Sequence, residues 1–398
     1  MTPELGQWVN LNIETTDYCN QRCGYCNQTN KINAMHGLGT KNAFMDVEVF
    51  KRLVDKMEGG VVRAFSPYWS GEPLLHPKTP ELFRYLFEAS KQKGIFEEFF
   101  MNTNGYYLTE EVAEILLDYA AFIERAPLNR RMFITFSLDS VTPAIYSRIR
   151  GVAEHHLETI LANIDRFLHL RAKRKICWPS VTYQAVVCPE NFDELEAFRT
   201  YWQTRLDRLG VPYTVLTQLT YLDRQDAIFF RQRDEGDFSA GVKMKLLHDR
   251  AVERLNGRQV PQDDENRQTV SRNMESATPA QGDWLKTKRA CRQLWSMLIV
   301  SKDGRAVPCC KDLFFELKLG NLKEQSINEL WHGERLKTLR LEQIQGQFDR
   351  HVICSNCINP PGGELRLEEV VAYLESVNRL DLLADYVDRL YAPGVTST

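Results

Sequence analysis

The chain opens on a strict alternation of apolar and polar residues. Val9, Leu11 and Ile13 are apolar, and the residues between them are polar. A period of two puts successive side chains on opposite faces, so this segment predicts a β-strand.

Strand patterns then alternate with helical ones over the first half of the chain. The predicted strands cover residues 9–13, 61–65, 96–101, 133–138, 181–187 and 213–217. The predicted helices begin after Asp46, cover residues 80–93, 109–121 and 157–174, and resume after Asn191, which with Glu194 looks like a capping box. Such alternation implies parallel strands with right-handed crossovers, so we expect an α/β fold, an open six-unit barrel, over residues 1–222.

The pattern breaks after residue 222. Residues 223–288 are rich in Asp, Arg, Gln and Asn, with one helix near 242–255, which predicts a polar insertion or linker; a lid over the barrel mouth is the alternative. Residues 289–362 predict a second unit, with a strand at 294–300, its hairpin partner at 305–307 and a helix over 326–345. Residues 363–398 predict a C-terminal helix.

Composition excludes several classes of protein. The 398 residues are 43% apolar and 26% charged, as in an ordinary globular protein. The net charge of −3 lacks the excess of positive charge that binding to nucleic acid or to an anionic membrane requires. No apolar run approaches the length of a membrane span. Ten cysteines without a signal peptide indicate a reducing cytoplasm and metal clusters.

Three of these cysteines follow the first predicted strand. Cys19, Cys23 and Cys26 lie at the strand's C-terminal end, where α/β barrels place their chemistry. Thiolates are soft ligands, and three of them can hold three irons of a 4Fe–4S cube while leaving the fourth open to an outside molecule. A structural zinc site would need a fourth ligand, and the next candidate, His36, is ten residues beyond Cys26. Zinc and purely structural thiols remain the alternatives.

The Cys-x3-Cys-x2-Cys spacing, with the aromatic Tyr25 before the last cysteine, resembles the signature of the radical S-adenosylmethionine (radical SAM) superfamily. The resemblance implies a partial (β/α)6 barrel and a [4Fe–4S] cluster that binds S-adenosylmethionine and cleaves it to a 5′-deoxyadenosyl radical. It also implies a flavodoxin- or ferredoxin-type electron donor.

Further segments resemble cofactor-binding positions of that superfamily. Ser70-Gly71-Glu72-Pro73 is similar to its Gly-Gly-Glu-Pro motif, which binds the methionine amino group, with Ser70 in place of the first glycine. Asn104, Ser137 and Asp139 end the third and fourth strands and resemble positions that line the cofactor. For Arg148 and Arg150, solvated charges at a helix end are the expectation, and an approach to the cofactor carboxylate is the alternative.

A second cysteine set lies in residues 289–362. Cys291, Cys309, Cys354 and Cys357, with the turn at Gly304, resemble the SPASM/Twitch-type auxiliary-cluster domain in its shortened form. This implies a second [4Fe–4S] cluster with four thiolate ligands, closed to substrate. Cys310 is an alternative ligand, and a four-cysteine zinc site is the competing interpretation.

Together these features predict a radical SAM enzyme. We expect a small polar substrate of sugar or aminocyclitol type, because no N-terminal domain that could grip a leader peptide precedes the first strand. The expected reaction is a dehydrogenation, epimerisation or rearrangement. Maturation of a ribosomally made peptide is the first alternative, and a non-catalytic iron–sulfur or zinc protein is the second. The sequence identifies no residue that donates or accepts a proton.

Overall fold

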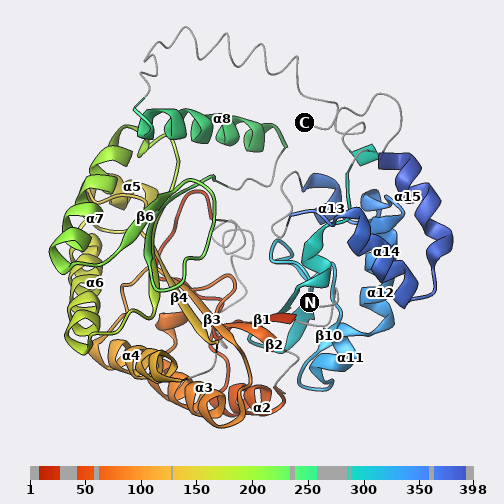
Figure 1. The fold of residues 1–398 in the computed structure, drawn as a ribbon, viewed down its shortest axis with the longest axis horizontal. Coiled ribbons are helices and arrows are strands. Elements are labelled where there is room, and N and C mark those ends of the chain that lie inside the picture. Colours follow the sequence, from red (N-terminus) through yellow and green to blue (C-terminus); the bar gives the residue numbers. More distant parts are fainter. Residues whose placement is uncertain are drawn as a thin grey trace, which may run out of the picture.

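A single curved sheet runs through the computed structural model of the chain (Figure 1). The structure describes residues 9–26, 43–57, 62–126, 129–233, 238–257, 285–286, 288–357 and 363–390. The sheet order is β10-β9-β8-β1-β2-β3-β4-β5-β7-β6. Within the described residues, no helix is both long and apolar enough to cross a membrane.

Seven parallel strands form the barrel part of the sheet. They are β1 (Val9–Ile13), β2 (Val62–Ser66), β3 (Glu98–Thr103), β4 (Arg131–Ser137), β5 (Ser180–Val186), β6 (Tyr213–Leu216) and β7 (Asp226–Arg231). The six predicted strands are all present, and the α/β fold class is confirmed.

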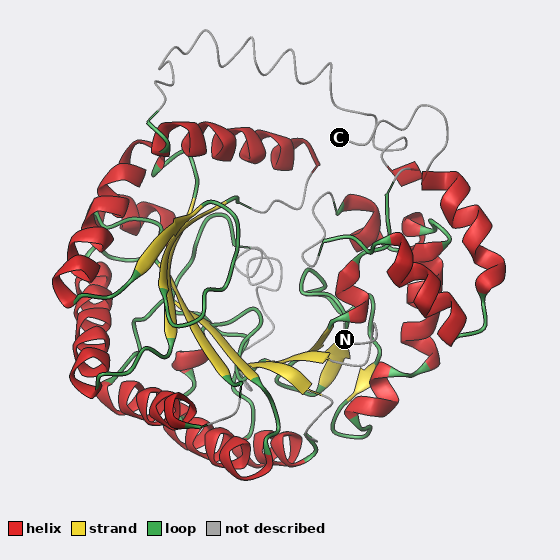
Figure 2. Ribbon diagram, in the orientation of Figure 1, coloured by secondary structure: helices red, strands yellow, loops and turns green. Residues whose placement is uncertain are grey.

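Helices cover the outer, convex face of this sheet (Figure 2). They are α2 (Val47–Asp55), α3 (Thr79–Lys93), α4 (Glu110–Arg125), α5 (Pro143–Arg150), α6 (His155–Arg174), α7 (Leu195–Leu209) and α8 (Phe238–Leu255), with short 3-10 turns η1 (Pro73–Leu75) and η2 (Phe192–Glu194). No range was predicted for helix α5, although Arg148 and Arg150 were expected at a helix end. The expected helix near 242–255 is α8.

Strand β7 lies inside the segment predicted to be a polar insertion, so the prediction that barrel strands end before residue 223 is wrong. The polar first residue of this strand, Asp226, finds its hydrogen-bond partners inside the protein. Asp226 is buried and accepts two hydrogen bonds from Arg171 of α6, at 2.8 and 2.7 Å. A buried ion pair of this geometry offsets the cost of removing both charges from water. Residues 258–284 of the insertion lie outside the described residues, so the role of the insertion as a lid stays a prediction.

The C-terminal part continues the same sheet. Strand β8 (Met297–Val300) pairs in parallel with β1, and β9 (Arg305–Val307) and β10 (Gly320–Asn321) follow in antiparallel pairing. The other elements here are η3 (Arg292–Trp295), α11 (Ile327–Trp331), α12 (Glu334–Ile344), η4 (Phe348–Arg350), α13 (Val352–Asn356), α14 (Leu367–Ser376), η5 (Leu380–Leu382) and α15 (Leu383–Leu390). One cluster of buried apolar side chains extends from Val9 to Leu390, so both parts share a core.

Two predicted C-terminal elements differ from the structure. The helix expected over 326–345 divides into α11 and α12 at Gly333, where an added Cβ would lie 2.7 Å from the Glu329 carbonyl oxygen. The strand expected from residue 294 begins at Met297, because η3 occupies the preceding residues.

Candidate metal centres

The N-terminal cysteine loop leaves β1 and is held by the end of helix α5. The Arg22 amide donates to the Arg150 carbonyl at 2.8 Å, and the Gly24 amide donates to the Ile149 carbonyl at 3.2 Å. Gly151, at φ +60°, caps the helix, and a Cβ there would lie 2.6 Å from the Arg22 carbonyl oxygen. The loop that carries Cys19, Cys23 and Cys26 is therefore fixed by backbone contacts.

The Ser70–Pro73 segment packs on the start of the same loop. A Cβ on Gly71 would lie 2.2 Å from the Thr16 carbonyl oxygen, so only glycine fits this position. The Glu72 amide donates to the Tyr18 carbonyl at 2.7 Å. Both the amide and the hydroxyl of Ser70 donate to the buried Glu14 carboxylate. This bond explains how serine is accommodated where the resembled motif has glycine.

The Glu72 side chain ties the loop to the edge of the sheet. It is buried and accepts from the Thr103 hydroxyl at 2.6 Å, the Asn104 amide at 2.8 Å and the Leu74 amide at 3.1 Å. Burial raises the pKa of Glu72, although these hydrogen bonds act in the opposite direction. Asn104 in turn donates from Nδ2 to Oδ1 of Asn20, at 2.8 Å. Glu72 and Asn104 thus position the cysteine loop.

The side chain of Asp139 is enclosed by protein groups. Its side chain is 0% exposed, and its Oδ1 accepts from the Val186 amide at 2.9 Å. Its Oδ2 accepts from the Tyr25 hydroxyl and lies 2.8 Å from Nε of Arg150. Asp139 therefore anchors Tyr25 and Arg150, and its expected contact with the cofactor stays a prediction. Ser137 ends β4 at the same edge and is half-buried, so it keeps its predicted role as a cofactor contact.

The structure contradicts the expectation that Arg150 is a solvated charge at a helix end. Arg148 is exposed, as expected of a solvated helix-end charge, but Arg150 is only 5% exposed. Its Nη1 lies 3.7 Å from Sγ of Cys23 and 3.4 Å from Oε1 of Gln21. Burial is the largest influence on the pKa of the Cys23 thiol and raises it, whereas Arg150 lowers it. The Gly151 stop signal after Arg150 could have revealed helix α5, but no sequence signal shows that the arginine is buried.

Asn191, predicted as part of a capping box, instead supports this network. Its Nδ2 donates to the Asp139 carbonyl at 2.8 Å and to the Val186 carbonyl at 3.0 Å. Asp139 has φ +66°, a left-handed conformation that is uncommon for a residue other than glycine. The bonds from Asn191 and Val186 hold it in this conformation.

An iron–sulfur cube fits the donors that surround the loop. Within the part of the chain that the structure describes, Nη2 of Arg150 and Nδ2 of Asn20 are buried without a hydrogen-bond partner. Buried donors without acceptors are costly, so an acceptor is expected beside them. Cluster sulfides and thiolates are such acceptors, and three thiols supply the soft ligands that iron prefers.

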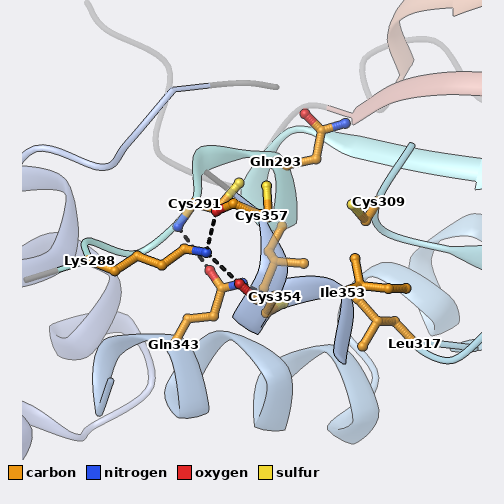
Figure 3. A pocket seen from close by; sticks show the side chains of 10 residues that line it. Lys288, Cys291, Gln293, Cys309, Leu317, Gln343, Ile353, Cys354 and Cys357 are labelled. Atoms are coloured by element: carbon orange, nitrogen blue, oxygen red, sulfur yellow. Dashed lines mark hydrogen bonds between the residues drawn. The ribbon is translucent and has the colours of Figure 1, made fainter. Parts of the chain in front are cut away.

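The second cysteine set lines a pocket between η3, β9 and α13 (Figure 3). The pocket is lined by Lys288, Cys291, Gln293, Leu294, Cys309, Leu317, Gln343, Ile353, Cys354 and Cys357. All four predicted ligands are therefore brought together. Cys310 does not line this pocket, and its carbonyl accepts from the Trp69 indole at 2.9 Å. Of the two adjacent cysteines, only Cys309 lines the pocket, and its role as a cluster ligand stays a prediction.

Two polar side chains that the sequence did not single out organise this pocket. The amide of Cys291 donates to Oε1 of Gln343 at 2.8 Å, and Nε2 of Gln343 lies 3.5 Å from Sγ of Cys354. Lys288, 4% exposed, donates from Nζ to the carbonyls of Cys354 and Cys357 (Figure 3). Burial lowers the pKa of Lys288 and raises the pKa of the Cys291 thiol to about 12. In the described residues, no group of three or more His, Cys, Asp or Glu side chains is arranged to hold a single metal ion.

Comparison with known families agrees with this geometry. The radical SAM superfamily matches residues 13–201, and the SPASM iron–sulfur cluster-binding domain matches residues 291–358. This chain belongs to the radical SAM superfamily. Its two matched domains imply a SAM-binding [4Fe–4S] cluster at the N-terminal cysteines and an auxiliary cluster in the C-terminal SPASM domain.

Individual relatives are distant. GTP 3′,8-cyclase of Hydrogenovibrio crunogenus is 28% identical over 193 residues, which are 48% of this radical SAM chain and 50% of that protein. The S-adenosyl-L-methionine-dependent 2-deoxy-scyllo-inosamine dehydrogenase of Niallia circulans is 27% identical over 74 residues, 19% of this chain and 30% of that protein. The chain thus spans at most half the length of these curated relatives.

The fold has a counterpart among solved structures. Streptococcus suis SuiB bound to S-adenosylmethionine superposes with a TM-score of 0.52 at 12% sequence identity. The superposition covers 94% of this chain and 75% of SuiB. At this identity the likeness concerns the fold alone.

Proposed function

We propose that this radical SAM enzyme removes a hydrogen atom from a small polar substrate of sugar or aminocyclitol type, and that the overall reaction is a dehydrogenation. The observation that carries the proposal is the four-cysteine pocket of Cys291, Cys309, Cys354 and Cys357. A cluster with four thiolate ligands has no open iron, so it suits electron transfer better than substrate binding. A dehydrogenation needs such an electron acceptor after hydrogen removal. One of the relatives is named as a 2-deoxy-scyllo-inosamine dehydrogenase, and 2-deoxy-scyllo-inosamine is an aminocyclitol, which supports this proposal.

Each residue of the first centre has a role in this proposal. Cys19, Cys23 and Cys26 bind three irons, and the cluster and S-adenosylmethionine, when bound, supply the radical that breaks a C–H bond. Glu72 and Asn104 hold the loop at the edge of the sheet. Ser137 and the Ser70–Pro73 backbone face the cofactor. Tyr25 fixes the loop through its bond to Asp139.

Residues on the inner side of the barrel are candidates for substrate contact. Tyr221, in the loop between β6 and β7, packs on Phe100 and Phe133, with ring centroids 4.7 and 5.1 Å apart. Desolvation raises the pKa of Tyr68 and of Tyr221 and outweighs the opposing effect of the nearby Arg231, although 39% of Tyr221 is exposed. Aromatic faces beside a cation and two phenols suit a polar ring.

Isotope transfer tests the proposal. The anaerobically reconstituted enzyme would receive S-adenosylmethionine, dithionite and carbon-deuterated 2-deoxy-scyllo-inosamine. We expect deuterium in 5′-deoxyadenosine and a keto product, measured by mass spectrometry, and neither from the Cys23→Ser variant. Parallel reactions with deuterated GTP and with deuterated candidate precursor peptides test the alternatives. Deuterium transfer from one of these, and not from the aminocyclitol, would contradict the proposed substrate class.

A further inference from the structure

A buried guanidinium group lies directly beside a cysteine of the first centre. Nη1 of Arg150 is 3.7 Å from Sγ of Cys23, and the whole arginine is 5% exposed. An N–H group of a cation that points at a thiolate forms a charge-assisted hydrogen bond. Charges interact more strongly in such a buried place than in water, so this contact affects the electron density on the sulfur.

The carboxylate that pairs with Arg150 contacts a different nitrogen of the guanidinium group from the one that contacts Cys23. Asp139 faces Nε, at 2.8 Å, whereas Cys23 faces Nη1. Oδ2 of Asp139 also accepts from the Tyr25 hydroxyl, which offsets part of its negative charge. Asp139 therefore holds the arginine in place without occupying the group that contacts the sulfur. Nε makes this ion pair without hydrogen-bond geometry, and Nη2 is also buried without a hydrogen-bond partner within the described residues.

We propose that Arg150 is a positioning residue that raises the reduction potential of the N-terminal cluster through its hydrogen bond and charge at Cys23. Reduction of a [4Fe–4S] cube adds one negative charge, so a fixed neighbouring cation stabilises the reduced form more than the oxidised form. Buried cations and hydrogen bonds to cluster sulfurs are established means of setting such potentials. The inference depends on the proposed assignment of Cys23 as a ligand.

The proposed effect of Arg150 on the potential can be tested on the reconstituted full chain by potentiometric titration, with the reduced clusters detected by electron paramagnetic resonance. The signal of the N-terminal cluster is the one that changes when S-adenosylmethionine is added, because only that cluster has an open iron. For Arg150→Met we expect the equilibrium constant for reduction to fall at least tenfold, which corresponds to about 59 mV for one electron. Arg150→Lys, which keeps the charge, should shift less. Arg148→Met, an exposed arginine on the same helix, should leave the potential unchanged.

Asp139→Asn provides a test of opposite sign. Removing the negative charge beside the arginine should raise the reduction potential of the N-terminal cluster. If Arg150 and Asp139 had a merely structural role, both Arg150→Met and Asp139→Asn would lower the iron content and leave the potential unchanged. Equal potentials for wild type, Arg150→Met and Asp139→Asn would overturn the inference, as would a change confined to S-adenosylmethionine affinity. If the wild-type protein forms no N-terminal cluster, the assignment of Cys23 as a ligand fails instead. Iron content distinguishes this failure from a failure of the inference about the potential, in which the cluster forms but its potential does not change.

Discussion

The two cysteine centres differ in how the chain surrounds them. The N-terminal loop presents three thiols at the edge of the barrel and is held mainly by backbone contacts and by the carboxylates of Glu72 and Asp139. The C-terminal pocket collects four thiols among apolar side chains such as Leu294, Leu317 and Ile353. This difference fits the proposed function, in which the first centre admits an outside molecule and the second only passes electrons.

Both centres nevertheless contain one buried cation. Arg150 contacts a cysteine sulfur in the first centre, and Lys288 contacts cysteine carbonyls in the second. A cation beside a sulfur acts on the cluster's electrons, while a cation on carbonyls fixes the loop that carries the ligands. The comparison therefore assigns an electronic role to the arginine and a mainly structural one to the lysine.

Removal of one ligand from each centre should give the largest effects. For Cys23→Ser, formation of 5′-deoxyadenosine should fall to background, because S-adenosylmethionine loses its iron site. For Cys357→Ser, the cleavage should continue but without substrate oxidation. Each variant should lose about half of the iron, since each centre holds one cluster. Iron analysis and chromatography of 5′-deoxyadenosine check this. Loss of cleavage in Cys357→Ser with an intact N-terminal cluster would contradict the separation of roles.

A methyl group at Gly71 should disrupt the first centre alone. The new Cβ would lie 2.2 Å from the Thr16 carbonyl oxygen and 2.6 Å from that of Tyr18, and both are backbone atoms. We expect Gly71→Ala to destabilise the protein by about 3 kcal/mol and to lose the N-terminal cluster. The matched control is Gly24→Ala in the same loop, because nothing lies within 4 Å of the added Cβ. Denaturant unfolding and iron content measure both variants, and equal losses in the two would contradict the steric explanation.

Much of the fold could be predicted because the strands and helices carry clear periods. The exceptions have local causes. Strand β7 begins with Asp226, which reads as a surface residue until Arg171, fifty-five positions earlier, is seen to pair with it. Helix α5 spans only Pro143–Arg150, too short for its period to stand out.

The cysteines of both sites could also be predicted, since their spacing is local. The supporting residues could not, because each depends on long-range placement. Arg150 looks like an ordinary helix-end charge, and Lys288 looks like the last residue of a polar linker. Their burial follows from how α5 and the residues before Cys291 pack, which no short motif encodes.

Replacement of Lys288 should weaken the second centre without affecting the first. Lys288→Met removes two charge-assisted hydrogen bonds to the carbonyls of Cys354 and Cys357, which should cost about 2 kcal/mol and loosen the auxiliary cluster. Lys245→Met, on the exposed face of α8, is the control. Iron release to a chelator measures the effect, and the potential of the N-terminal cluster should stay constant. A change in that potential would show that the centres are electrostatically coupled.

The smallest effect is expected at Glu369, which joins α14 to the residue after Cys291. Burial acts to raise the pKa of Glu369, but hydrogen bonds from Arg292 and Arg366 outweigh it and lower the pKa from 4.5 to about 2. A carboxyl with a lowered pKa stabilises the fold above its ordinary pKa, and this stability is lost as the pH falls from about 4.5 to about 2. After allowance for solvent screening, the contribution at neutral pH is about 1 kcal/mol.

Urea unfolding of the metal-free chain can measure this contribution, because acid would release iron from the loaded protein. Glu369→Gln should lower the free energy of unfolding at pH 7 and should remove the corresponding part of its pH dependence below pH 4.5. Glu368→Gln, whose side chain is 65% exposed, should change neither. Because Glu369 pairs with Arg292, next to Cys291, the C-terminal part of the wild-type chain should unfold before the barrel in acid. Simultaneous loss of barrel structure would instead show that the shared core makes the two parts unfold as one unit.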